Sequence, residues 1–228
     1  MRTGEPAPAA RSMPGRYGAL LILLVVSYLL ASFITGRWVE ALQVVLFTVA
    51  MLLALRSAAI SRRAVRGVLY AAIIGLPVMF FLSLSRATGD VGTGIADVWT
   101  ALVLLAAAVM IVHRVLTFNM VTLQSIYGAI SAYLVLGLMF AAVFAAIYHF
   151  SGDKFFASGE QANTQTFQYF SFPTLTTLGY GDYTAIANSG RSVAVMEALT
   201  GQVFLATLVA RLVAAFRSSG DSSGDRRG

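Results

Sequence analysis

The sequence predicts an all-α membrane protein with six transmembrane helices in each chain. Hydrophobic residues make up 58% of the 228 residues and charged residues only 11%, and a soluble domain of this length could not bury so much apolar surface. Six stretches are apolar over about the 20 residues that a helix needs to cross a bilayer. Between the fifth and sixth lies a segment too long for a turn, with a short amphipathic stretch and a glycine-containing loop.

The predicted spans follow one another through short polar connections. They cover residues 17–35, 38–55, 67–84, 95–112, 123–150 and 191–216. The fourth is the weakest, because it is short and has Asp97 near its start. Residues 1–16 and 218–228 are predicted to be disordered tails, since they are rich in Pro, Ala and Arg or in Ser and Gly. A cleaved signal peptide is the weaker interpretation of the start, because the first apolar run is too long.

Arginine placement predicts the orientation of these spans. With the N-terminus in the cytoplasm, every Lys and Arg falls on the cytoplasmic side except Arg37, Arg86, Lys154 and Arg191, as the positive-inside rule requires. Both termini are therefore predicted to be cytoplasmic. The formal charge of +6 follows from this topology, and no nucleic-acid partner is expected, since its binding face would cluster basic residues on one soluble surface. The 56–66 cluster could contact anionic lipid, but topology alone already explains it.

The loop before the sixth span carries the most specific motif of the chain. It reads Thr176-Thr177-Leu178-Gly179-Tyr180-Gly181-Asp182. Glycines on both sides of an aromatic residue let consecutive carbonyls turn to the same side, because glycine accepts backbone angles that other residues resist. A row of carbonyl oxygens can replace the hydration shell of a cation. The alternative is a tight turn in an unrelated loop, which does not account for the flanking threonines, the aspartate and the neighbouring span.

This motif resembles the signature of the potassium channel superfamily, with Leu178 where valine is commoner. Residues 119–217 resemble the pore domain of bacterial potassium channels: an outer helix, a re-entrant pore helix over 167–176, a filter and an inner helix. The resemblance implies a potassium-selective channel that conducts K+ passively across the plasma (inner) membrane. It also implies that Thr177, Leu178, Gly179 and Tyr180 bind K+ through their carbonyls, and that Gly181 ends the row.

The assembly expected from this resemblance is a homotetramer. One filter strand cannot surround an ion, and the chain has a single Gly-Tyr-Gly sequence, so four copies around a shared axis are required. No cofactor is expected besides potassium ions in the filter. An enzyme is not expected, because no nucleophile–base pair or carboxylate pair converges at one membrane depth.

Four residues are candidates for supporting the filter: Thr176, Asp182, Tyr169 and Glu197. Tyr169 and Phe170 stand where two tryptophans are common in the family. Tyr169 could donate a hydrogen bond to Asp182, and simple packing is an equal alternative. Glu197 either bonds behind the filter or reaches water at the outer interface. Pro173 removes a backbone donor late in the pore helix, where some potassium channels have an acid that braces the filter.

Other residues leave alternatives open. Gly201 is a candidate gate hinge, or it allows close helix packing. Arg211 is predicted at the inner mouth, as a topology anchor, a repellent of cations or a lipid contact. His113 and His149 have no companions at ligand spacing, so metal sites outside the filter are not predicted. His149 could sense external pH, although an ordinary interfacial histidine is the simpler interpretation.

Residues 17–114 have the topology of a voltage-sensing domain without its charges. No Arg or Lys lies between residues 98 and 112, whereas each gating charge contributes about 2.3 kcal/mol per 100 mV. Strong voltage gating is therefore not expected, and these spans are either a chargeless relative of a sensor or a lipid-facing scaffold. After residue 216 we expect no cyclic-nucleotide or calcium-binding domain, because only a short Ser/Gly-rich segment follows. A separate regulatory protein is the partner left open.

Two rival functions remain for the whole chain. A weakly selective cation channel is the first, because some channels keep Gly-Tyr-Gly and still leak sodium. A non-conducting membrane scaffold or regulatory subunit is the second.

Overall fold

The computed structural model describes residues 16–34, 36–57, 62–84, 89–117 and 123–224, and this part of the chain contains seven helices. They are α1 (Arg16–Phe33), α2 (Arg37–Ser57), α3 (Arg62–Leu84), α4 (Gly89–Thr117), α5 (Leu123–Ser151), α6 (Thr164–Leu175) and α7 (Asn188–Gly224). The only β-structure among the described residues is an isolated bridge between Phe156 and Ala185. The all-helical prediction is confirmed.

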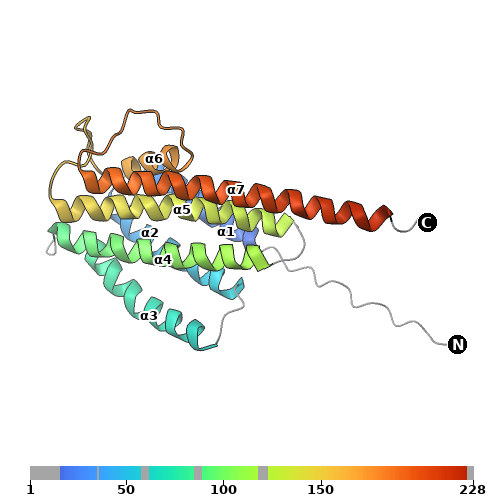
Figure 1. Ribbon diagram of the computed structural model, residues 1–228. Coiled ribbons are helices and arrows are strands. Elements are labelled where there is room, and N and C mark those ends of the chain that lie inside the picture. The colour runs from blue at the N-terminus through green and yellow to red at the C-terminus, as the bar shows by residue number, and fades with distance from the viewer. Residues whose placement is uncertain (1–15, 35, 58–61, 85–88, 118–122, 225–228) are drawn as a thin grey trace.

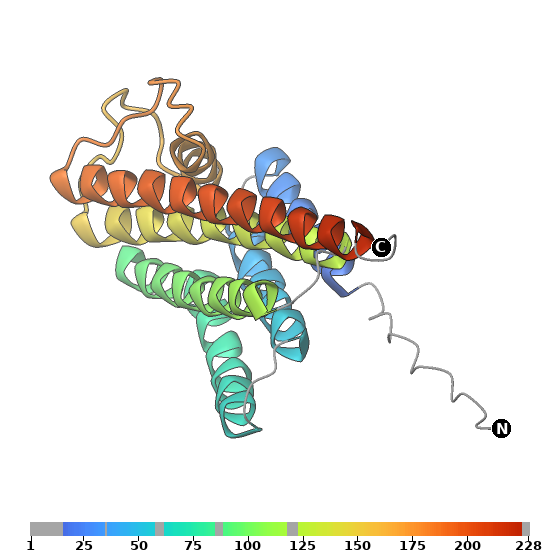
Figure 2. The ribbon, with the colours of Figure 1, turned by 45° about the vertical axis from the view of Figure 1, so that its right-hand side comes forward.

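Three long helices form the front of the molecule (Figure 1). α5 lies between α4 and α7 and packs against both, while α1 and α2 cover the other side of the bundle. α6 is short and lies at one end, between α5, α7 and α1, with the loops on either side of it above α7. α3 leaves the bundle at an angle and packs on α2 and α4 (Figure 2).

Four helices in the described part of the chain are long and apolar enough to cross a membrane. Their apolar segments are Trp38–Leu55, Gly89–Thr117, Leu123–Ser151 and Asn188–Arg211. α1 and α3 carry shorter apolar stretches, Tyr17–Phe33 and Leu69–Leu82. The described structure therefore supports a membrane protein, and the six-span topology stays a prediction.

The fourth helix is much longer than predicted. The expected span covers residues 95–112, whereas α4 has 29 residues and contains Asp97 in its third turn. Asp97 is accommodated because its Oδ2 lies 2.8 Å from Nδ1 of His149 on α5. The two helices also approach closely at Gly94, where an added Cβ would lie 3.1 Å from the Phe150 ring. Asp97, which made the predicted span at residues 95–112 look weak, is thus part of a contact between α4 and α5.

The last helix also extends beyond its predicted end. α7 reaches Gly224, although the predicted span stops at residue 216 and residues 218–228 are predicted to be disordered. A helix that is already formed adds further residues at low cost, even where Ser and Gly are weak helix formers. Residues 225–228, like residues 1–15 of the predicted N-terminal tail, lie outside the described residues.

Two buried clusters hold the helices together. The larger joins α1, α2, α4 and α5 and reaches α6 through Leu175. The smaller is aromatic and lies under the loops around α6; its ring pairs include Phe144–Phe170 at 4.9 Å and Phe155–Phe167 at 5.1 Å, both edge to face, an arrangement that aromatic rings favour. Phe170 is therefore a core residue, only 8% exposed.

Candidate functional site

α6 is anchored at its start by a reciprocal cap. Asn163 Oδ1 accepts a hydrogen bond from the Thr166 N–H at 2.9 Å, and Thr166 Oγ1 accepts one from the Asn163 N–H at 2.9 Å. This capping box satisfies two backbone donors at the helix end. It starts α6 at Thr164, three residues before the predicted pore helix over 167–176, and the helix ends at Leu175.

The side of α6 is held by α1 and α5. The Phe172 ring lies over Gly137 of α5, where an added Cβ would come within 2.6 Å of it. The same ring meets Tyr28 of α1 edge to face, with centroids 5.1 Å apart. Gln165 also donates a hydrogen bond to the Ser32 carbonyl of α1. The first helix of the chain therefore helps to position α6.

The C-terminal end of α6 rests on α7 at Gly201. A Cβ added to Gly201 would lie 2.1 Å from the carbonyl oxygen of Leu175. That oxygen also accepts a hydrogen bond from the Tyr133 hydroxyl at 3.2 Å. α7 passes through Gly201 without interruption. The structure therefore gives Gly201 a close-packing role, and its role as a gate hinge stays a prediction.

Gly201→Ala is expected to displace the end of α6 and destabilise the protein. The new methyl group would overlap the Leu175 carbonyl, and backbone atoms cannot move aside by changing rotamer. The expected loss in the free energy of unfolding is therefore about 1–3 kcal/mol for each chain. Thermal unfolding of the purified protein in detergent measures it as a lower Tm. Gly18 of α1 is the matched control, because no atom lies within 4 Å of its Cβ position and Gly18→Ala should keep or raise the Tm. Equal Tm values for the two variants would contradict the contact.

Backbone handedness alternates through the segment after α6. The backbone angle φ is +57° at Thr177, +53° at Gly179 and +81° at Gly181, while Leu178 and Tyr180 have negative φ. Alternation of this kind turns successive N–H groups to one side of the chain. A positive φ is uncommon for a residue other than glycine and marks candidate functional sites, so Thr177 is notable.

The hydrogen bonds of this segment fix the direction of two carbonyls. The N–H groups of Leu178 and Gly179 both donate to the Pro173 carbonyl, at 2.8 Å and 3.2 Å. A trans peptide points its C=O away from its N–H, and the described residues contain no cis peptide. The carbonyls of Thr177 and Leu178 therefore both face away from α6. Pro173, which lacks an N–H of its own, contributes the acceptor that makes this possible.

The side chains of the segment contact α6 and α7. Tyr180 stacks on Tyr169 of α6, with the ring centroids 6.3 Å apart and the planes 12° from parallel. Thr177 Oγ1 accepts a hydrogen bond from Gln202 Nε2 of α7 at 2.9 Å, and Thr176 Oγ1 donates to the Phe172 carbonyl at 2.8 Å. Gln202 was not predicted as a site residue from the sequence. The signal that could have identified it is a polar side chain within an apolar span.

Tyr169 and Asp182 form the hydrogen bond that was one of the two expected alternatives. The Tyr169 hydroxyl donates to Asp182 Oδ2 at 2.7 Å, and Asp182 Oδ1 accepts from the Tyr183 N–H at 3.0 Å. The hydrogen bond to the Asp182 carboxylate raises the pKa of Tyr169 to about 12, so the phenol remains a neutral donor at physiological pH. Tyr169 thus ties the helix before the segment to the residue that follows it.

Tyr169→Phe is expected to loosen the outer end of this segment without changing the fold. If the segment selects ions, the variant should lower the K+ to Na+ flux ratio of reconstituted protein. Asp182→Asn should lower it to a similar degree, and the double variant should add little, because both remove the same contact. Tyr183→Phe is the matched control, since the described structure gives its hydroxyl no hydrogen bond. Additive effects of Tyr169→Phe and Asp182→Asn would argue against a shared role.

Glu197 is fully buried and bonded to α6. Ser171 Oγ lies 2.5 Å from Glu197 Oε1 and 2.7 Å from the Gly137 carbonyl oxygen. A serine hydroxyl has one hydrogen, so it can donate to only one of these oxygens. A neutral Glu197 that donates to Ser171, while Ser171 donates to Gly137, satisfies both contacts. Glu197 is therefore buried against α6 and does not reach water. Its role in supporting a filter stays a prediction, and Ser171 joins the candidate residues.

The described residues show no group of three or more His, Cys, Asp or Glu side chains that could hold a metal ion. His149 instead pairs with Asp97 beside a polar cavity of about 110 Å³ between α2, α4, α5 and the start of α6. External pH sensing by His149 stays a prediction.

Comparison with known families bears on the same part of the chain. Residues 133–218 match a family model described as an ion channel. The match begins in α5, includes α6 and the 176–182 segment, and ends in α7. A comparison with curated proteins gave no match. Residues 133–218 are therefore similar to an ion channel domain, which supports ion conduction as the activity.

Proposed function

We propose that four copies of this chain form a potassium-selective channel that conducts K+ passively through their joined 176–182 segments. The observation that carries the proposal is the backbone of these residues: handedness alternates from Thr177 to Gly181, and the Thr177 and Leu178 carbonyls face away from α6. Carbonyls arranged in this way can replace the water around a dehydrated K+ ion. The proposed ion sites are formed by Thr177, Leu178, Gly179 and Tyr180.

Exposure in the single chain supports assembly into a ring. Leu178 and Tyr180 are 58% and 66% exposed, although both have large side chains. The apolar surface of α7 on the side of Gln202 is also largely uncovered, as at Val195, Val209 and Val213. One strand covers only one side of an ion, and a closed ring of four identical subunits supplies the other sides.

The surroundings of the segment also suit a cation. The C-terminal end of α6 leads directly into Thr177, and this end of a helix carries partial negative charge. The proposal includes a plasma membrane location, six spans and cytoplasmic termini. A separate regulatory protein would be a further partner.

The proposed role of the first four helices is a scaffold for the channel domain. α1 contacts α6 through Tyr28 and Ser32, and α4 is bound to α5 through Asp97 and His149. The central part of α4 has no basic residue, with Arg114 only in its last turn. These contacts support a scaffold role for the first four helices better than a voltage-sensing role, because α4 lacks the charges that would move it in an electric field.

Flux measurements on purified protein in lipid vesicles test the proposal. The expected result is K+ flux well above Na+ flux, with block by barium, from a particle that cross-linking shows to be a tetramer. Equal K+ and Na+ flux would favour the weakly selective cation channel. Absence of flux from intact tetramers would favour the scaffold or regulatory subunit and overturn the proposal.

A further inference from the structure

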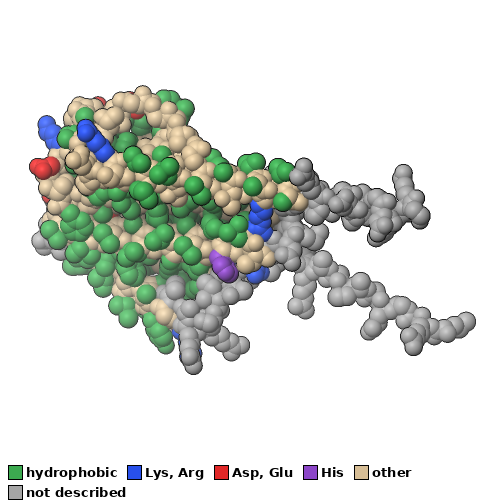
Figure 3. All heavy atoms as spheres, viewed as in Figure 1, with side chains coloured by type: hydrophobic (Ala, Val, Ile, Leu, Met, Phe, Trp, Pro, Cys, Tyr) green, Lys and Arg blue, Asp and Glu red, His purple; other side chains and the backbone are tan. Residues whose placement is uncertain are grey.

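An apolar groove of about 680 Å³ lies between α4, α5 and α7. Ala129 and Ala132 of α5 form its floor, and their small side chains leave room above them. The walls come from α4, with Val109 and Val112, and from α7, with residues that include Phe204. Figure 3 shows this face of the molecule, where apolar side chains cover most of the surface over the three helices.

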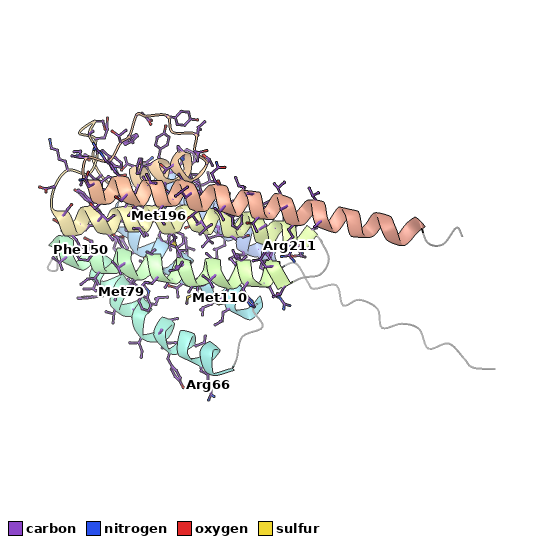
Figure 4. The ribbon with its side chains drawn as sticks, in the orientation of Figure 1. Arg66, Met79, Met110, Phe150, Met196 and Arg211 are labelled. Carbon is purple, nitrogen blue, oxygen red and sulfur yellow. The ribbon has the colours of Figure 1, made fainter. Side chains whose placement is uncertain are left out.

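One end of the groove is basic. His113 of α4 and Arg211 of α7 both line it, and no Asp or Glu is among the described residues that do so. Arg211 lies where α7 passes the end of α5, whereas Arg66 lies near the end of α3 that projects from the bundle (Figure 4). An apolar groove with a cationic end is complementary to a molecule with an acyl chain and an anionic head group. Basic pockets of this kind between transmembrane helices bind acidic lipid head groups.

The groove faces away from the proposed ion path. Gln202 marks the side of α7 that points to the filter, because its amide donates to Thr177. An α-helix turns by about 100° for each residue, so Phe204 and Arg211 lie about half a turn round the helix from Gln202. Copies assembled around their filters would therefore leave the groove on the outer side of α7, toward the bilayer.

We propose that this groove binds an anionic membrane phospholipid, with its phosphate at Arg211 and His113 and one acyl chain along Val109 and Val112. The planar guanidinium of arginine suits a phosphate, since it can donate two parallel hydrogen bonds. Bound lipid bridges α4 and α7, and so connects the peripheral helices to the helix behind the filter. The inference uses the assembly proposed above but does not depend on potassium selectivity.

Thermal unfolding in detergent tests the site without any flux measurement. Added phosphatidylglycerol should raise the Tm of the full-length protein, and phosphatidylcholine should raise it much less. Arg211→Gln should weaken the apparent affinity for phosphatidylglycerol about fivefold, the contribution expected of one basic residue. Val109→Trp should weaken it by filling the groove, since Val109 is 60% exposed and tolerates a larger side chain.

Two matched variants control for general effects. Arg66→Gln removes the same charge from α3, at a residue that does not line the groove. Leu102→Trp adds the same ring to α4 at a residue that is 57% exposed and does not line the groove. Both should respond to phosphatidylglycerol like the unmodified protein. The site is overturned if Arg211→Gln and Arg66→Gln lose the response equally, or if the two lipids stabilise the protein equally.

A second measurement identifies the occupant directly. The chain has no cysteine, so Val109→Cys introduces a unique thiol in the groove. Phosphatidylglycerol should slow labelling of this thiol by a membrane-permeant maleimide, and phosphatidylcholine should not. A thiol that stays protected without added or co-purified lipid would show that a second copy of the chain covers the groove, which would overturn the lipid assignment.

Discussion

Replacing Gly179 with alanine is expected to remove most of the preference for K+ over Na+ while the helices remain assembled. Gly179 has φ of +53°, in the left-handed region that costs residues with a Cβ about 1–2 kcal/mol each. In a ring of four copies this strain would add up to about 4–8 kcal/mol. The backbone relieves it by rotating a peptide, which turns a carbonyl away from the ion. The added methyl meets no atom within 4 Å in its own chain, so the backbone angle is the cause.

The matched control for this variant is Gly159→Ala. Gly159 also has positive φ, +75°, and also has open space at its Cβ position, but it lies in the loop before α6. The same strain at that position should lower the Tm slightly and leave selectivity unchanged. K+ and Na+ fluxes from matched vesicles measure both variants. Unchanged selectivity in Gly179→Ala would contradict the proposed filter more directly than any change in stability.

Local sequence patterns predicted the helices well, because apolar runs of bilayer length need no knowledge of their neighbours. The same patterns misjudged α4, since Asp97 looked like an obstacle to a span. Its partner His149 is 52 positions away, and no pattern within one helix contains that contact. The cap at Asn163 was missed for a different reason: the amphipathic stretch begins later than the helix does.

Within the candidate site, the sequence predicted which residues are candidates but did not determine which of the alternative roles each one has. The motif at 176–182 is contiguous, so its backbone behaviour follows from local rules about glycine. The contacts of Glu197 with Ser171 and of Gln202 with Thr177 join residues 26 and 25 positions apart. They depend on how α6 crosses α7, which is set by Gly201 and the Leu175 carbonyl. Only the packed structure shows the close contact between Gly201 and the Leu175 carbonyl.

The protonation of Glu197 leads to the second large expected effect. Glu197→Gln should keep most of the stability and flux, because the amide can donate to Ser171 as a neutral carboxyl does. Glu197→Ala should lower stability by about 3 kcal/mol for each chain, because it leaves a buried cavity and removes the donor to the Ser171 hydroxyl. Glu197→Lys should be worse, since it buries a charge that has no partner there. Tm values and K+ flux from the three variants provide the measurement.

Ser171→Ala separates the hydrogen bonds from the packing of the Glu197 side chain. It removes the hydroxyl that connects α7 to the Gly137 carbonyl of α5, and it should cost less than Glu197→Ala because the carboxyl still fills its space. If Glu197→Gln proves as damaging as Glu197→Ala, the carboxyl must be ionised and accept from Ser171, which would leave the Gly137 carbonyl without that donor. A tolerated glutamine instead means that α5, α6 and α7 are joined beside the 176–182 segment by a chain of neutral hydrogen-bond donors.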